Sequence, residues 1–307
     1  MDSQIEEFLE HLEIERQASK LTIRDYRHYL EVFNKWFSST LPHKSIHDLD
    51  LAIVRRYRVY LSNYTDEKGK SLKKVTQNYY VIALRSFLRF LIKNDVKTLE
   101  PSKIDLPKTE SRSLKFLERE QIEQLVTMPD TSTEEGARDR TVLELLFSTG
   151  LRVSELVKLD HGQINLERRE FGVIGKGGKA RIVFVSDRAA EWLAIYMGMR
   201  KDGFKPLFIR YSGLVVEEDG GEKMRLTVRS IERIVKKYVR LARLPVDATV
   251  HTLRHSFATD LLMNGADLRS VQEMLGHKNI ATTQIYTHIT NKQLRDVHKA
   301  FHSGNKD

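Results

Sequence analysis

Near its C-terminus the chain carries the segments His251-Thr252-Leu253-Arg254-His255, Gly276-His277 and Ile285-Tyr286-Thr287-His288. This block combines histidines, an arginine and a tyrosine. An arginine fork can donate two parallel hydrogen bonds to phosphate oxygens, a histidine can transfer a proton, and a tyrosine hydroxyl can act as a nucleophile. The block therefore indicates chemistry at a phosphate group.

The same histidines allow a metal interpretation. His251 and His255 stand four residues apart on a predicted helix, which is the spacing of the histidine pair in zinc proteases. The glutamate that follows the first histidine in those enzymes is absent, and Arg254 would place a cation beside the metal. A structural role for His255 and His288 stays open. We predict no metal site.

Two further candidates lie far upstream of this block. Arg152 precedes Glu155 by three residues, so both fall on one side of a helix. The pair is either an ordinary surface ion pair or a partly buried arginine that a carboxylate holds toward a phosphate. Lys176 lies in the glycine-rich turn at 175–179, where it is either solvated or able to reach a DNA strand and carry a proton.

The region around these residues predicts a domain of helices and a few strands. Helical periodicity predicts helices at residues 117–126, 136–147, 188–199, 227–242, 251–263, 268–275, 281–286 and 291–301. Alternation of residue types predicts short antiparallel strands at residues 163–166, 170–174 and 180–185. The polar run at 217–223 is predicted to be an exposed loop.

Residues 1–95 predict four helices and no strand. Aromatic residues recur at helical spacing, as in Phe33 and Phe37 or Tyr57 and Tyr60. Because they follow the helical period, we interpret them as core residues and not as platforms for stacked bases. The pattern is typical of a compact four-helix domain.

Positive charge is concentrated in this N-terminal part. The whole chain has a net charge of +9, and residues 51–90 alone have a net charge of +7. Their basic side chains fall between apolar positions of the third and fourth helices, so we expect them to face outward. They form either a solubilising surface or a set of phosphate contacts. We favour phosphate contacts, with these candidates: Arg55, Arg56, Lys73, Lys74 and Arg85.

The composition predicts a cytosolic globular protein of two domains. Residues 96–113 lose the helical periodicity, so we predict a linker there between domains at 1–95 and 114–307. No apolar run is long enough to span a membrane, and the acidic N-terminus is unlike a signal peptide. The chain has no cysteine, which excludes disulfides, thiol nucleophiles and thiolate zinc sites.

Together these motifs resemble the tyrosine recombinase (phage integrase) family, and most closely its Xer branch. The resemblance covers the whole chain. It implies a mainly α fold with a small antiparallel β-sheet, in which a SAM-like core-binding domain of four helices precedes an α+β catalytic domain. The residues that carry it are Arg152 within the run 149–156, Lys176, His251 and Arg254 within the run 251–259, and His277 and Tyr286 within the run 275–288.

The resemblance implies a mechanism based on a covalent intermediate. Tyr286 would attack the scissile phosphodiester, form a 3′-phosphotyrosine and release a 5′-hydroxyl. Arg152 and Arg254 would bind the non-bridging oxygens and offset the charge of the transition state. Because the covalent bond conserves the phosphodiester energy, no cofactor and no metal is needed.

The remaining residues would assist these steps. Lys176 would protonate the leaving 5′-oxygen, and His251 would assist proton transfer. His277 would hydrogen-bond a phosphate oxygen, while Glu155 would support the site. Three features depart from the Xer pattern: Asp260 replaces a common histidine, Ala180 replaces a common acidic residue, and 217–223 resembles an insertion.

The resemblance also implies partners. The protein would act on a double-stranded DNA recombination site as a homo- or hetero-tetramer that exchanges C-terminal helices, with a paralogous recombinase and a DNA translocase as further candidates. Such an enzyme would resolve chromosome or plasmid dimers through a Holliday junction, in support of chromosome partition and cell division. The alternatives are a mobile-element integrase, a topoisomerase with the same chemistry, a zinc hydrolase and a non-catalytic DNA-binding protein.

Overall fold

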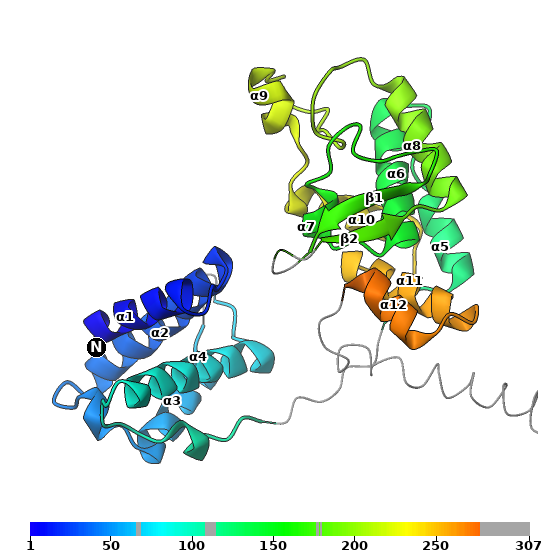
Figure 1. Cartoon of the computed structure of the whole chain (residues 1–307). Helices are drawn as coiled ribbons and strands as arrows, with labels where there is room; N and C mark the ends of the chain where they lie inside the picture. The colour runs from blue at the N-terminus through cyan, green and yellow to red at the C-terminus, as the bar shows by residue number, and fades with distance from the viewer. Residues whose placement is uncertain (66–68, 108–114, 176–177, 179, 277–307) are drawn as a thin grey trace, which may run out of the picture. The chain divides into compact units, whose positions relative to one another are not determined.

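The chain divides into two units, residues 1–112 and residues 113–307. Among the described residues, one hydrophobic core cluster lies in the first unit and two lie in the second. The computed structural model describes residues 1–65, 69–107, 115–175, 178 and 180–276. Each of the two units is described here by itself (Figure 1). None of the helices within the described ranges is long and apolar enough to cross a membrane.

The N-terminal unit is built from the four predicted helices: α1 (Asp2–Ile14), α2 (Lys20–Thr40), α3 (Leu51–Asn63) and α4 (Lys74–Lys93). Side-chain caps determine where two of them begin. The Ser19 hydroxyl accepts a hydrogen bond from the Thr22 amide, and the Asp50 carboxylate accepts one from the Ile53 amide. These caps satisfy amide groups that have no partner in the first turn of a helix.

The aromatic residues fill the core of this unit, as predicted. Phe33, Phe37 and Tyr57 are buried, and the rings of Phe33 and Tyr57 meet edge to face with centroids 5.0 Å apart. The chain after α4 continues on the same core through the short 3-10 helix η2 (Pro101–Lys103), where Pro101 and Ile104 are buried. The first part of the segment 96–113 is therefore packed on the N-terminal unit.

The C-terminal unit is built mainly from helices. Its elements are α5 (Arg119–Val126), α6 (Glu134–Thr149), α7 (Val153–Leu156), β1 (Glu170–Ile174), β2 (Ala180–Phe184), α8 (Asp187–Met199), α9 (Glu218–Gly221), the 3-10 helix η3 (Glu222–Met224), α10 (Val228–Leu241), α11 (Val250–Met263) and α12 (Leu268–Leu275). The helices predicted at 281–286 and 291–301 lie outside the described residues.

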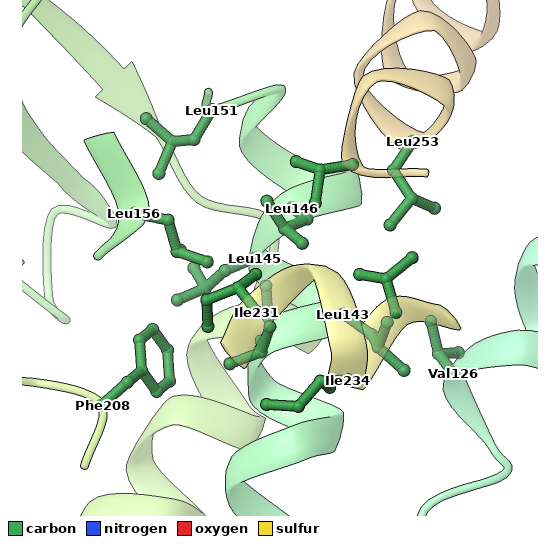
Figure 2. Packing of buried hydrophobic residues seen from close by; sticks show 14 of the residues in the cluster. Val126, Leu143, Leu145, Leu146, Leu151, Leu156, Phe208, Ile231, Ile234 and Leu253 are labelled. Carbon is green, nitrogen blue, oxygen red and sulfur yellow. The ribbon is translucent and has the colours of Figure 1, made fainter. Parts of the chain in front are cut away.

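Helix α6 is the centre of this unit. It contacts α5, α8, α10 and α11, and its leucines at 143, 145 and 146 are fully buried. Figure 2 shows Leu145 of α6, Ile231 of α10 and Leu253 of α11 in the same core. A helix buried on almost all sides needs apolar residues on more than one face, and α6 has them.

Among the described residues of this unit, the sheet has two antiparallel strands, with Val173 paired to Arg181 and Ile174 to Ala180. The strand predicted at 163–166 is wrong. That segment forms only a single bridge, between Asn165 and Glu170, and the Asn165 side chain accepts a hydrogen bond from the Arg168 amide. This contact closes a tight turn, so the polar run folds back on itself instead of extending the sheet.

The loop predicted at 217–223 is also partly wrong. The segment contains the four-residue α9, in which Asp219 and Gly220 have left-handed and not helical backbone angles, followed by η3. Gly221 and Met224 are buried, although the acidic side chains at 217–219 are exposed. Gly221 has a φ of +76°, and a Cβ there would lie 2.4 Å from the ring of Phe204. The glycine therefore permits a close contact that anchors this segment to the domain.

Candidate active site

Arg152 is placed by the end of α6. Gly150 ends that helix with a φ of +57°, and a Cβ at this position would lie 2.5 Å from the ring of Phe257. The left-handed residue turns the chain sharply, as glycine commonly does after a helix. Two residues later Arg152 occupies the N-cap position of α7, with its side chain 26% exposed.

Glu155 holds Arg152 from the first turn of α7. One carboxylate oxygen accepts the Arg152 amide and the other accepts Nη1 of the Arg152 side chain, both at 2.9 Å. Glu155 itself is buried. Of the two interpretations open at the sequence level, the structure has the one with a partly buried arginine held by a carboxylate.

The charge of Glu155 depends on its arginine partners. Burial raises the pKa of this carboxyl, but hydrogen bonds from Arg181 and Arg152 and the charge of Arg181 outweigh burial and lower the pKa to about 2. The carboxylate is therefore ionised at neutral pH and balances part of the positive charge of the site.

Arg254 reaches the same place from α11. Thr249 and Thr252 cap the start of this helix reciprocally, and Arg254 follows one turn later. Its buried guanidinium donates to the carbonyl oxygen of Gly150 and, at 2.6 Å, to that of Leu275. Arg254 thus joins the end of α6 to the end of α12.

His251 lies three residues before Arg254 on α11 and is exposed. Residues three apart share one side of a helix, so both side chains belong to one face. His255 is half-buried, and burial, together with the charges of His251 and Arg254, lowers its pKa. His255 is therefore held toward its neutral form.

The C-terminus of α12 brings the arginines together. Its last carbonyl groups, at Met274, Leu275 and Gly276, accept hydrogen bonds from Arg181, Arg254 and Arg152, respectively. Carbonyls in the last turn of a helix have no partner within the helix and carry partial negative charge. Three guanidinium groups from three different elements satisfy them here.

Arg181 is the member of this cluster that the sequence interpretation missed. It lies on β2, and its two terminal nitrogens donate to the two oxygens of Glu155 at 2.9 and 2.8 Å. A signal was present, because alternate residues of a strand share a face. Arg181 shares its face with the buried Val183 and Val185, so it is a charged residue at an inward position.

The cluster has the chemistry of an anion site. Two guanidinium groups bond to the carboxylate of Glu155 and that of Arg254 bonds to carbonyl groups, which leaves an excess of positive charge at the ends of α6 and α12. The guanidinium of Arg152 has five N–H groups, and two of them donate hydrogen bonds to the described residues. The other N–H groups can therefore bind a phosphate. Within the described part of the chain, no group of three or more metal-ligating side chains could hold a metal ion.

The other predicted residues fall in two groups. Lys176, His277 and Tyr286 lie outside the described residues; Lys176 belongs to the segment between β1 and β2, and the others follow α12 in the sequence. The predicted DNA contacts lie on α3 and α4 or directly before α4. Arg55, Arg56, Lys73 and Lys74 are exposed, whereas Arg85 is half-buried and does not face fully outward as predicted.

Comparisons with known proteins cover both units. The model of the phage integrase family matches residues 115–293, and that of the phage integrase N-terminal SAM-like domain matches residues 5–95. The tyrosine recombinases XerD of Staphylococcus haemolyticus (strain JCSC1435) and Listeria innocua serovar 6a (strain ATCC BAA-680 / CLIP 11262) are 35% and 37% identical to this chain. Each alignment covers 98% of this chain and 99% of the relative.

A solved structure is similar in fold. The site-specific recombinase XerH, in a post-cleavage complex with palindromic difH substrate, is 26% identical with a TM-score of 0.69. The match covers 97% of this chain and 84% of XerH. These similarities confirm the predicted fold class of a SAM-like helical domain followed by an integrase domain.

The lowered pKa of Glu155 predicts an acid-dependent loss of stability. An ionised Glu155 stabilises the fold fully above its ordinary pKa of 4.5, and this contribution disappears as the pH falls toward the folded-state pKa of about 2. The difference in unfolding free energy between the wild type and Glu155→Gln should therefore be roughly 3 kcal/mol near pH 6 and about half of that near pH 3.

Chemical denaturation at each pH measures this difference. Glu167→Gln, at an exposed position, is the control, and it should change the unfolding free energy by less than about 0.5 kcal/mol at either pH. An equal difference for Glu155→Gln at pH 6 and pH 3 would contradict the assignment of a strongly bonded carboxylate.

Proposed function

Because the chain belongs to the phage integrase family of tyrosine recombinases, we propose that it cuts and rejoins DNA at a specific site through a covalent phosphotyrosine. One observation supports this proposal most strongly. Arg152 and Arg254 come from different elements, yet they donate to the adjacent carbonyls of Gly276 and Leu275. Two guanidinium groups so close together suit the two non-bridging oxygens of one phosphodiester.

The proposed cleavage step is an exchange of one phosphate ester for another. The Tyr286 oxygen forms a bond to phosphorus, and the bond from phosphorus to the 5′-oxygen breaks. The electron pair of that bond goes to the 5′-oxygen, which takes a proton from Lys176. His251 assists the transfer of the proton that Tyr286 loses. The products are a 3′-phosphotyrosine and a free 5′-hydroxyl.

The other site residues stabilise the transition state of this step. Arg152 and Arg254 bind the non-bridging oxygens, where negative charge increases during attack, and His277 hydrogen-bonds one of them. Glu155 keeps Arg152 in place through its two contacts. Rejoining reverses the reaction: a 5′-hydroxyl of a partner strand attacks phosphorus and releases Tyr286. One round of exchange gives a Holliday junction, and a second round resolves it.

The biological role that we propose is the resolution of chromosome or plasmid dimers in the cytoplasm, in support of chromosome partition. Its support is the 35–37% identity to XerD proteins over nearly the full length of both chains. We further propose that the protein acts on DNA as a tetramer that exchanges C-terminal helices, with a paralogous recombinase or a DNA translocase as candidate partners. A mobile-element integrase of the same family is the alternative role.

We also propose that residues on α3 and at the start of α4 contact the DNA backbone. Arg55, Arg56, Lys73 and Lys74 are exposed and form part of the region with a net charge of +7. Exposed arginine and lysine side chains can bind phosphates without reading the base sequence. Arg85 is half-buried and is the weaker candidate of the five.

The nucleophile can be tested with a nicked suicide substrate, from which the short cleaved strand diffuses away. The wild type should accumulate a covalent protein–DNA complex that resists denaturation. Tyr286→Phe should reduce its formation by about 10,000-fold or more, because no hydroxyl remains to attack phosphorus. Tyr79→Phe, at an exposed tyrosine of the N-terminal unit, is the control and should behave as the wild type. Complex formation by Tyr286→Phe would refute the assignment.

This assay, together with tests of supercoil relaxation and of chelator sensitivity, separates the alternatives. A non-catalytic DNA-binding protein forms no covalent complex even as wild type, whereas a topoisomerase relaxes supercoiled DNA that lacks a specific site. A zinc hydrolase would lose activity in the presence of a chelator. We expect site-dependent strand exchange that a chelator does not change.

The proposed DNA surface predicts a change in salt dependence. Reversal of Arg55, Arg56 and Lys73 to glutamate should weaken binding roughly tenfold or more. It should also reduce the slope of log affinity against log salt by about 0.9 for each phosphate that the variant no longer neutralises. Filter binding or fluorescence anisotropy at several salt concentrations measures both effects.

A matched control carries the same three charge reversals in the C-terminal unit. Lys201, Lys205 and Lys223 are exposed and lie outside the proposed surface on α3 and α4. The control should retain the wild-type slope to within about one unit. Equal slopes for the two triple variants would remove the argument for a DNA surface on α3 and α4.

A further inference from the structure

Arg181 connects the sheet to the proposed phosphate site. Its side chain is only 11% exposed, and it forms a two-point ion pair with Glu155 across 26 residues of sequence. Its third nitrogen, Nε, donates to the carbonyl oxygen of Met274 at 3.1 Å, across 93 residues. One side chain thus binds β2, α7 and the end of α12 to one another.

We propose that Arg181 is a positioning residue for strand transfer, which holds Glu155 and the end of α12 so that Arg152 points its guanidinium at the scissile phosphate. This inference rests on the proposed function, since it assigns Arg181 a part in the same reaction. Arg181 acts through Glu155 and the α12 carbonyl and does not itself contact the reacting atoms.

The hydrogen bonds around Glu155 explain why Arg181 is needed. Each carboxylate oxygen accepts one hydrogen bond from Arg152 and one from Arg181, so the four donors fix both its position and its rotation. Loss of Arg181 removes half of these donors from a buried carboxylate. A buried carboxylate with fewer donors keeps its proton to a higher pH, and a neutral Glu155 binds Arg152 less well.

Gly276, at the end of α12, packs against the side chain of Arg181. It ends α12 with a φ of +64°, and a Cβ at this position would lie 3.2 Å from Cδ of Arg181. The missing side chain therefore leaves room for the arginine beside the helix end. The chain leaves α12 at this glycine and continues to His277 and Tyr286, so Arg181 lies at the last described turn before two of the proposed site residues.

An arginine is required here for its shape as well as for its charge. The planar fork presents parallel N–H groups to the two oxygens of Glu155 and directs Nε toward Met274. A lysine ammonium is a single point charge, so it can keep the charge balance of Glu155 without reproducing this geometry. The lysine variant therefore separates a charge effect from a positioning effect.

The test compares Arg181→Gln and Arg181→Lys in the full chain. Cleavage is measured as the rate of covalent complex formation on the nicked suicide substrate at saturating protein, and DNA affinity is measured separately. We expect cleavage by Arg181→Gln to fall about 100-fold, with affinity within roughly threefold of the wild type, because a small misplacement of a catalytic group has a large effect on rate. Arg181→Lys should lose roughly tenfold.

A double-variant cycle shows whether Arg181 acts through Glu155. If it does, adding Arg181→Gln to Glu155→Gln should cost less than about threefold in cleavage, because the interaction is already absent. If the rate loss of the double variant equals the product of the losses of the two single variants, the proposal is overturned.

The pH profile of cleavage is a second readout. As the pH is lowered, Arg181→Gln should lose cleavage activity at a higher pH than the wild type does. Arg168→Gln, at an exposed arginine just before β1, is the control and should match the wild type.

The outcomes separate this inference from the proposed function. If the wild type forms no covalent complex, the proposed function fails. If the wild type reacts and Arg181→Gln reacts equally fast, only the positioning role fails. If Arg181→Gln does not fold, Arg181→Lys decides: full activity of the lysine variant overturns the proposal, and a loss of cleavage with retained affinity supports it.

Discussion

The proposed active site depends on the capping of one helix end. The carbonyls of Met274, Leu275 and Gly276 end α12, and each accepts a hydrogen bond from a different arginine. Carbonyls at a helix C-terminus need such donors, and their partial negative charge favours cations. Because the arginines belong to β2, α11 and the start of α7, satisfying this one helix end brings three distant parts of the sequence to a single place. Glu155 then neutralises part of the charge that results.

Much of the fold follows from periodic patterns in the sequence. Helical spacing predicted the four helices of the N-terminal unit and most helices of the C-terminal unit, and cap residues such as Ser19 and Asp50 account for where two of them begin. The predictions that were wrong concern short segments, in which side-chain contacts and not the local sequence pattern determine the structure. The Asn165 turn replaced a predicted strand, and the contact between Gly221 and Phe204 anchored a segment predicted to be an exposed loop. Neither contact can be found from alternation or polarity alone.

The site was predictable to the extent that its contacts are local. Arg152 and Glu155 are three residues apart, so their pairing could be predicted from the spacing, although Arg152 lies at the N-cap of α7 and not within a helix, and the burial of Glu155 could not be predicted. Arg181 was missed because its partners are 26 and 93 residues away, and only its inward position on a strand could indicate it. The roles of Lys176, His277 and Tyr286 stay predictions that rest on the family motifs. If a phosphate binds between Arg152 and Arg254, these two arginines and the three residues predicted from the family motifs would act on the same phosphate in one reaction.

The most direct measurement is a crystal structure of the Tyr286→Phe variant bound to the DNA site that the protein protects from nuclease. Our account predicts that the guanidinium groups of Arg152 and Arg254 both lie about 2.7–2.9 Å from non-bridging oxygens of the scissile phosphate. It also predicts that the residue at 286 faces the same phosphorus atom on the side opposite the 5′-oxygen. A scissile phosphate bound away from these two arginines, or a different hydroxyl facing its phosphorus, would contradict the account.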